Sequence, residues 1–289
     1  MRIRRPFVVA ALAVATTVSL ALASFTSASA SLPTVYYLAL GDSLSVGYQP
    51  VPTPGDTDQG YTDQLLPKLQ AVHPFEHIVL VKMGCSGETT GTMINGGKCT
   101  DGRYPLGSQL KQAEAFLRAN GTAVKYVTID IGANDVDGCA RGPLGVDPVC
   151  IAQGTVTIEQ NLPVIVQGLR AADGALPRSV GMSYYDPFLA DWLTGTQGQT
   201  VALASLTALI GLNNAEQLSY TGGGFGFADV FGAFKSTTFS TNMFVAPYGK
   251  LPTAVAEICR WTYMCSLGNI HANPTGYGVI ATAFKAKMP

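Results

Sequence analysis

The chain has 289 residues, of which 13% are charged, and its formal net charge is −1. This low and balanced charge argues against a nucleic-acid partner and against a basic patch that binds membrane surfaces. Hydrophobic residues make up 47% of the chain, which is enough to bury a sizeable core.

The first thirty residues have the pattern of a secretory signal peptide. Three arginines precede an uncharged apolar stretch at 7–23, and an A-x-A cleavage signal ends at Ala30. We therefore expect residues 1–30 to be removed on export and residues 31–289 to form a single domain of a secreted, extracellular protein with no stable membrane anchor. A retained anchor is the alternative, since about 17 apolar residues approach the length of a membrane span.

Strand-like and helix-like segments alternate along the rest of the chain. In chain order they are a strand at Val35–Leu40, a helix at Tyr61–Val72, a strand at His77–Met83, a helix at Leu110–Arg118, a strand at Val124–Ile131, a helix at Val156–Ala171, a strand at Ser179–Tyr185, a helix at Ala202–Gln217, a less clear strand at Phe227–Phe231 and a helix at Thr275–Ala286. This alternation predicts the α/β class, with a central, mostly parallel five-stranded sheet covered by helices on both faces, in three layers.

Small and polar residues follow three successive strands. The first strand leads into Gly41-Asp42-Ser43, the second into Gly84-Cys85-Ser86-Gly87-Glu88-Thr89, and the third into Gly132-Ala133-Asn134-Asp135. Parallel strands present their carboxyl ends at one edge of a sheet, so these segments are expected to meet in one crevice. A serine at such a strand-to-helix turn lies near free backbone N–H groups and the positive end of a helix dipole. Ser43 is therefore the candidate nucleophile.

A serine hydroxyl reacts only when a base takes its proton, and the chain has three histidines. His73 and His77 lie between a predicted helix and the start of the second strand, at the edge of the sheet opposite the crevice, so structural roles are expected for both. His271 lies in a loop just before a predicted helix start at Pro274, from which it can reach the strand ends. It is the candidate general base.

Four segments together resemble the four sequence blocks of the GDSL/SGNH hydrolases. They are Gly41-Asp42-Ser43-Leu44-Ser45, Ser86-Gly87-Glu88-Thr89, Gly132-Ala133-Asn134-Asp135, and His271 followed by Pro274 and Gly276, in the order of the family. The resemblance implies a flavodoxin-like fold and a serine esterase or lipase that forms an acyl-enzyme on Ser43, with His271 as general base. It also implies an oxyanion hole made by the backbone N–H groups of Ser43 and Gly87 and the side-chain amide of Asn134.

The last block departs from the family pattern at the residue that orients the histidine. The family usually carries an aspartate two or three positions before it, and here those positions hold Asn269 and Gly268. Three explanations remain open: the backbone carbonyl of Gly268 orients the imidazole, the side-chain oxygen of Asn269 does so, or a distant carboxylate serves or the enzyme is weakly active. A non-catalytic extracellular binding module that retains the fold is the competing functional hypothesis.

The six cysteines fall into three close pairs. Export to an oxidising compartment favours the disulfides Cys85–Cys99, Cys139–Cys150 and Cys259–Cys265, although other connectivities are open. A metal site or free buried thiols are the alternative, but there is no C-x-x-C motif and the histidines are scattered. We expect no metal and no cofactor, a monomer, and an ester substrate: an acyl lipid, a small ester or an acylated polysaccharide. Aromatic residues after the fourth predicted strand either line an acyl pocket or pack in the core: Tyr184, Tyr185, Phe188 and Trp192.

Overall fold

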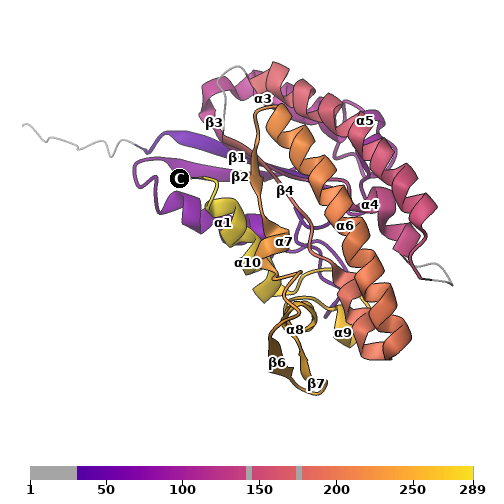
Figure 1. Ribbon diagram of the computed structural model, residues 1–289. Coiled ribbons are helices and arrows are strands. Elements are labelled where there is room, and N and C mark those ends of the chain that lie inside the picture. The colour runs from indigo at the N-terminus through magenta and orange to yellow at the C-terminus, as the bar shows by residue number, and fades with distance from the viewer. Residues whose placement is uncertain (1–30, 141–144, 174–177, 289) are drawn as a thin grey trace, which may run out of the picture. The chain divides into compact units, whose positions relative to one another are not determined.

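A parallel sheet of five strands forms the centre of the computed structural model, which describes residues 31–140, 145–173 and 178–288 (Figure 1). The expected signal peptide at 1–30 lies outside the described residues. The strands are β1 (Thr34–Gly41), β2 (His77–Lys82), β3 (Val124–Asp130), β4 (Arg178–Met182) and β5 (Gly226–Ala228). Every neighbouring pair in this sheet is parallel. The predicted five-stranded α/β architecture is thus confirmed.

The strand order is β2-β1-β3-β4-β5, which places the first strand of the chain inside the sheet. β1 pairs with β2 on one side and with β3 on the other, so that Leu38 lies opposite both Val81 and Val127. Its residues from Tyr37 to Leu40 are wholly buried, as expected for an inner parallel strand covered on both faces. After β1 the chain forms β2 on one side of β1, and it then crosses to form β3 on the other side. Such a reversal of strand order leaves a crevice at the carboxyl ends of β1 and β3.

Two groups of helices cover the two faces of the sheet (Figure 1). On one face α1 (Tyr61–Gln70) packs against α10 (Pro274–Lys285). On the other face α5 (Pro148–Asp173) packs between α3 (Gln109–Asn120) and α6 (Thr196–Gly222). The three-layer arrangement predicted from the alternating pattern is therefore present.

Several short elements were not predicted, because most of them span fewer residues than a hydrophobic period needs to become visible. They are η1 (Gly121–Ala123), α2 (Thr90–Asn95), α4 (Ala133–Val136), η2 (Asp137–Ala140), η3 (Pro187–Thr194), α7 (Val230–Ala233), the antiparallel hairpin β6 (Asn242–Val245) and β7 (Gly249–Pro252), α8 (Thr253–Trp261) and α9 (Met264–Leu267). The fifth strand is also shorter than predicted. It ends at Ala228 because the Asp229 side chain accepts the Gly232 N–H and begins α7.

Three disulfides join the cysteines in sequential pairs: Cys85–Cys99, Cys139–Cys150 and Cys259–Cys265. Each closes a short loop, so each fixes a local segment and does not tie distant parts of the chain together. Within the part of the chain that the structure describes, no helix is both long enough and apolar enough to cross a membrane.

Candidate active site

Ser43 and His271 meet at the carboxyl end of β1, although 228 positions separate them in the chain. The distance between Ser43 Oγ and His271 Nε2 is 2.8 Å, which is a hydrogen bond of ordinary length. Two further contacts join the segment after β1 to the segment around α10. Tyr277 of α10 donates its hydroxyl to the Tyr48 carbonyl at 2.9 Å, and the centroid of the Tyr48 ring lies 4.4 Å from that of the His271 imidazole.

The start of α10 fixes the loop that carries His271. Asn273 is the N-cap of the helix, and its side-chain oxygen accepts the N–H groups of Thr275 and Gly276 at 3.0 and 3.1 Å. Pro274 occupies the first helical position, where its missing N–H is not needed. His271 therefore lies two positions before the N-cap of this helix, in the loop just before the helix start, as the sequence predicts.

Asn269 contacts the other nitrogen of the imidazole. Its Oδ1 lies 2.8 Å from His271 Nδ1 and also accepts the backbone N–H of His271 at 3.1 Å. A backbone N–H can only donate, so the asparagine atom at this point must be the oxygen, and Nδ1 must carry the proton that faces it. Nε2 then presents its lone pair to the hydroxyl of Ser43, which is the arrangement a general base requires.

Gly268, the second expected orienter, closes α9 as its C-cap. Its φ of 62° lies in the left-handed region, and its N–H donates to the Met264 carbonyl at 2.9 Å. The next residues are held by Tyr185, whose hydroxyl donates to the Ile270 carbonyl at 2.8 Å. The turn at Gly268 thus directs the chain so that the Asn269 side chain folds back onto the histidine.

Two buried carboxyl groups support the turn that carries Ser43. Asp42 Oδ1 accepts the Leu44 N–H at 3.0 Å, and Asp130 Oδ2, at the end of β3, accepts the Ser45 N–H at 3.1 Å. Burial raises the pKa of Asp42, while burial and the negative charge of Asp42 raise the pKa of Asp130 well above its usual range. Tyr61 donates its hydroxyl to Asp130 at 2.6 Å, so the support extends into α1. Asp42 thus fixes the turn that carries Ser43.

The two other expected oxyanion donors, Gly87 and Asn134, occupy the segments that follow β2 and β3. Asn134, in α4, donates one amide hydrogen to the Glu88 carbonyl at 3.0 Å, which leaves its second amide hydrogen for another acceptor. Asn134 lines the same pocket as Ser43 and His271. Gly87 is not among the residues that line this pocket. It is the residue before Glu88, whose backbone carbonyl accepts the hydrogen bond from Asn134.

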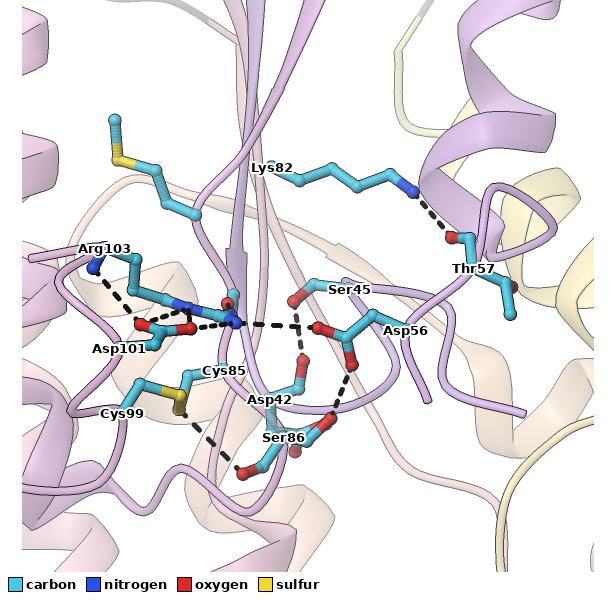
Figure 2. A network of polar contacts seen from close by, with 12 residues as sticks. Asp42, Ser45, Asp56, Thr57, Lys82, Cys85, Ser86, Cys99, Asp101 and Arg103 are labelled. Carbon is cyan, nitrogen blue, oxygen red and sulfur yellow. Dashed lines mark hydrogen bonds and ion pairs between the residues drawn. A yellow bond between two sulfur atoms is a disulfide. The ribbon is translucent and has the colours of Figure 1, made fainter. Parts of the chain in front are cut away.

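A polar network outside the pocket holds the loop that carries Gly87 (Figure 2). Ser86 donates its hydroxyl to Asp56 at 3.1 Å, and Arg103 donates to the Gly84 carbonyl at 2.7 Å while it pairs with Asp101 at 2.7 Å. The disulfide from Cys85 ties the same loop to the following segment. Such restraint from several directions is what a fixed backbone donor needs.

A largely apolar pocket opens beside Ser43, Asn134 and His271. Its walls include side chains from α4, α5, η3 and α6, among them Val136, Ile151, Phe188, Leu209 and Leu212. Tyr184, Tyr185 and Phe188, predicted to line an acyl pocket or the core, belong to its lining. Trp192 lies outside the lining and packs on Phe239, with ring centroids 5.4 Å apart. The contribution of α6 was not predicted, because an apolar helix face gives no sign of which residues border a pocket.

The match to a sequence family covers most of the chain. Residues 39–279 match the family described as GDSL-like Lipase/Acylhydrolase. The chain belongs to this family. Among residues that the structure describes, no group of three His, Cys, Asp or Glu side chains is placed to hold a metal ion.

Solved structures of GDSL-like and related enzymes share the fold. An acetylxylan esterase from Geobacillus stearothermophilus has a TM-score of 0.52 and 16% identity, with 89% of this chain and 95% of that chain covered. A phospholipase A1 from Streptomyces albidoflavus has a TM-score of 0.51 and 17% identity, with 88% and 99% covered. A GDSL-like lipase, described as putative, from Parabacteroides merdae has a TM-score of 0.54 and 14% identity, with 89% and 97% covered. At these identities the likeness shows the fold alone, and a sequence comparison with curated proteins finds no match.

In this GDSL-like family member, a glutamate is wholly buried behind the loop that leads to Asn134. Oε1 of Glu216, on α6, lies 2.4 Å from where a Cβ on Gly132 would stand, and the φ of Gly132 is 137°, so position 132 requires glycine. Neither carboxylate oxygen of Glu216 has a hydrogen-bond partner among the described residues. Burial, and then the charges of Asp42 and Asp135, raise the pKa of Glu216 well above its ordinary value.

Replacing Glu216 with glutamine is expected to stabilise the protein increasingly as the pH rises. With its pKa raised in the folded state, Glu216 binds more protons folded than unfolded, so wild-type stability falls as the pH climbs above the unfolded value of about 4.3. Glutamine does not ionise, so the variant gains up to about 1.4 kcal/mol per pH unit in this window. Urea unfolding at about pH 5 and about pH 7 measures the difference. Glu159→Gln, at an exposed position of α5, is the control, and an advantage that does not change with pH would contradict the assignment.

Proposed function

We propose that the protein is a secreted serine esterase or lipase that hydrolyses carboxylic esters through an acyl-enzyme on Ser43. The observation that carries this proposal is the 2.8 Å contact between Ser43 Oγ and His271 Nε2, with Nδ1 held at 2.8 Å by Asn269. Membership of the GDSL-like lipase/acylhydrolase family supports an ester as substrate. The expected signal peptide and the three disulfides support export.

The mechanism follows from the positions of these groups. His271 Nε2 takes the proton as Ser43 Oγ attacks the ester carbonyl carbon, and the imidazolium then gives that proton to the departing alkoxide. The negative oxygen of the tetrahedral intermediate accepts hydrogen bonds from the N–H groups of Ser43 and Gly87 and from the free amide hydrogen of Asn134. A water molecule, deprotonated by His271, then attacks the acyl carbon. The bond to Ser43 Oγ breaks, the acid leaves, and the imidazolium returns its proton to Oγ.

The orienting residue in this proposal is a neutral asparagine. Asn269 fixes the tautomer and direction of the imidazole, because its oxygen accepts the Nδ1 proton. It cannot add the negative charge that an aspartate supplies to the imidazolium formed during the reaction. The proposed Ser-His-Asn arrangement therefore keeps the geometry of a triad without its charge.

The pocket supports an acyl group with an apolar chain as the substrate part bound next to Ser43. Side chains such as Ile151, Leu209 and Leu212 offer a surface from which water is easily displaced by methylene groups. The neighbouring structures include an acetylxylan esterase and a phospholipase A1, whose substrates differ, so the fold does not choose between acyl lipids, small esters and acylated polysaccharides.

Hydrolysis of p-nitrophenyl esters tests the proposal. The mature protein is expected to release p-nitrophenol from the butyrate ester and from longer acyl esters, and an alkyl phosphonate is expected to label Ser43 and to stop the reaction. Peptide mass spectrometry locates the label. A protein that neither hydrolyses any ester of the series nor reacts at Ser43 would instead be a binding module that retains the fold.

Asn134→Ala is expected to lower kcat by about 10² to 10³, with a smaller change in KM. The side-chain amide donates to the oxygen only once that oxygen carries negative charge, so its loss affects the transition state more than the bound substrate. Steady-state kinetics with p-nitrophenyl butyrate measure both constants. Asn214→Ala, at an exposed position on α6, should keep the wild-type values. Equal kcat values for Asn134→Ala and the wild type would remove Asn134 from the oxyanion hole.

A further inference from the structure

One wall of the pocket, built by η3 and α6, contains a buried polar pair. Ser205, on α6, donates its hydroxyl to Oδ2 of Asp186 at 2.9 Å, and both residues line the pocket. Apolar groups surround the pair on the same wall: Pro187, Phe188, Ala208, Leu209 and Leu212. A carboxyl and a hydroxyl in such a wall are costly to bury unless their hydrogen bonds are satisfied.

The bonds within the protein use only part of the capacity of this pair. Asp186 Oδ1 accepts the Phe188 N–H at 3.0 Å and so caps η3, while Oδ2 accepts from Ser205. Each carboxylate oxygen can accept a second hydrogen bond, and so can the oxygen of Ser205. The single proton of Ser205 is shared between Asp186 and the Ala202 carbonyl, each at 2.9 Å. The pair therefore offers acceptors to a donor inside the pocket.

The capping of η3 does not by itself require this pair. An N-cap needs one acceptor for the N–H groups of the first turn, and Oδ1 of Asp186 supplies it. Oδ2 and Ser205 are additional. Burial, and to a smaller extent the negative charge of Asp191, raises the pKa of Asp186 to about 7. Near neutral pH the pair holds both a carboxyl and a carboxylate form, and both forms can accept a hydrogen bond.

We propose that Asp186 and Ser205 form a hydroxyl-binding subsite in the acyl pocket, so that the enzyme selects esters whose acyl chain carries a hydroxyl group. This inference rests on the proposed function, because it assigns the pocket to the acyl part of an ester. A hydroxyl on the acyl chain that reaches the pair donates a hydrogen bond to an oxygen of Asp186 or Ser205. An unsubstituted acyl chain offers these oxygens no donor. A hydroxyl that lies instead against Phe188, Leu209 or Leu212 meets side chains that accept no hydrogen bond, so it loses its bonds to water without replacement.

A positional series of hydroxylated esters tests the subsite. We expect one hydroxyl position on a p-nitrophenyl decanoate chain to raise kcat/KM by about tenfold over the plain ester, since one well-placed hydrogen bond has this effect. Asp186→Asn should bring the ratio of hydroxylated to plain ester close to one, because an amide NH₂ takes the place of the acceptor Oδ2. Ser205→Ala leaves that carboxylate oxygen to the ligand and should keep a ratio above one. Asp186→Asn keeps an N-cap for η3, and the ratio cancels any general loss of activity. Ser219→Ala, whose hydroxyl on the same helix contacts the Ala215 carbonyl outside the pocket, should keep the wild-type ratio.

A binding measurement separates failure of the subsite from failure of the proposed function. Titration calorimetry with Ser43→Ala protein and the same esters gives affinities without turnover. Preference for one hydroxyl position, lost on adding Asp186→Asn, supports the subsite even if the wild type hydrolyses nothing. If no position is preferred in either assay, or if the preference persists with Asp186→Asn, the subsite is overturned while ester hydrolysis can stand.

Discussion

Ser43→Ala and His271→Ala are each expected to lower kcat by about 10⁴ to 10⁶, and the double variant is expected to be no slower than either one. The hydroxyl and the imidazole act as one unit: without Nε2 at 2.8 Å the hydroxyl keeps its proton, and without the hydroxyl the imidazole has no nucleophile to activate. Steady-state kinetics of the three variants with p-nitrophenyl butyrate measure this non-additivity. The remaining rate should come from binding and from the oxyanion donors.

The controls for this experiment are a second histidine and a second serine. His77→Ala, at the exposed start of β2, and Ser266→Ala, at an exposed position of α9, should react at the wild-type rate. A His271→Ala protein as fast as the wild type would remove the histidine from the mechanism. Losses that multiply in the double variant would mean that the two residues act in separate steps.

Asn269→Ala is expected to lower kcat by about 10² to 10⁴, because the imidazole loses the acceptor that fixes its tautomer. The backbone N–H of His271 loses the same acceptor, so the ring is also less well directed. Asn269→Asp should retain activity, and the acidic limb of its pH–rate profile should move to higher pH, since a carboxylate stabilises the imidazolium.

Profiles of kcat/KM against pH for the two Asn269 variants and the wild type distinguish the candidate orienters. An unchanged rate for Asn269→Ala would assign the role to another group, such as the Gly268 carbonyl. Asn242→Ala, at an exposed position of β6, is the matched control and should leave both the rate and the profile unchanged.

The central strands and the loops that carry the candidate site residues could be predicted, because both show in the local order of apolar, small and polar residues. β1 reads as an apolar run and β3 as a mostly apolar segment, both are largely buried, and small and polar residues follow each of them. The order of elements then places Ser43 and Asn134 at one edge of the sheet. The motif residues could therefore be identified without knowledge of how the helices pack.

The long helices and the pocket wall could not be predicted to the same degree. α5 was expected from Val156 but begins at Pro148, within a stretch that reads as a loop, because its first turns lack a clear apolar period. Which side chains of α6 border the pocket depends on how η3 packs against that helix, and only tertiary structure decides this. The same holds for Asn269: its distance to Nδ1 follows from the left-handed turn at Gly268, which the sequence allows but does not specify.

The proposed nucleophile, Ser43, lies just after β1, and the proposed base, His271, lies just before α10. This order matters while the polypeptide is being made. A growing chain that already carries β1 and β3 has no imidazole beside Ser43 until the segment up to α10 has emerged and docked on α1. Contacts such as Gln64 Nε2 to the Pro274 carbonyl, at 2.8 Å, form only at that stage. If the proposed function holds, activity should therefore appear only once α10 has docked on α1, and molecules that lack this segment should leave esters intact.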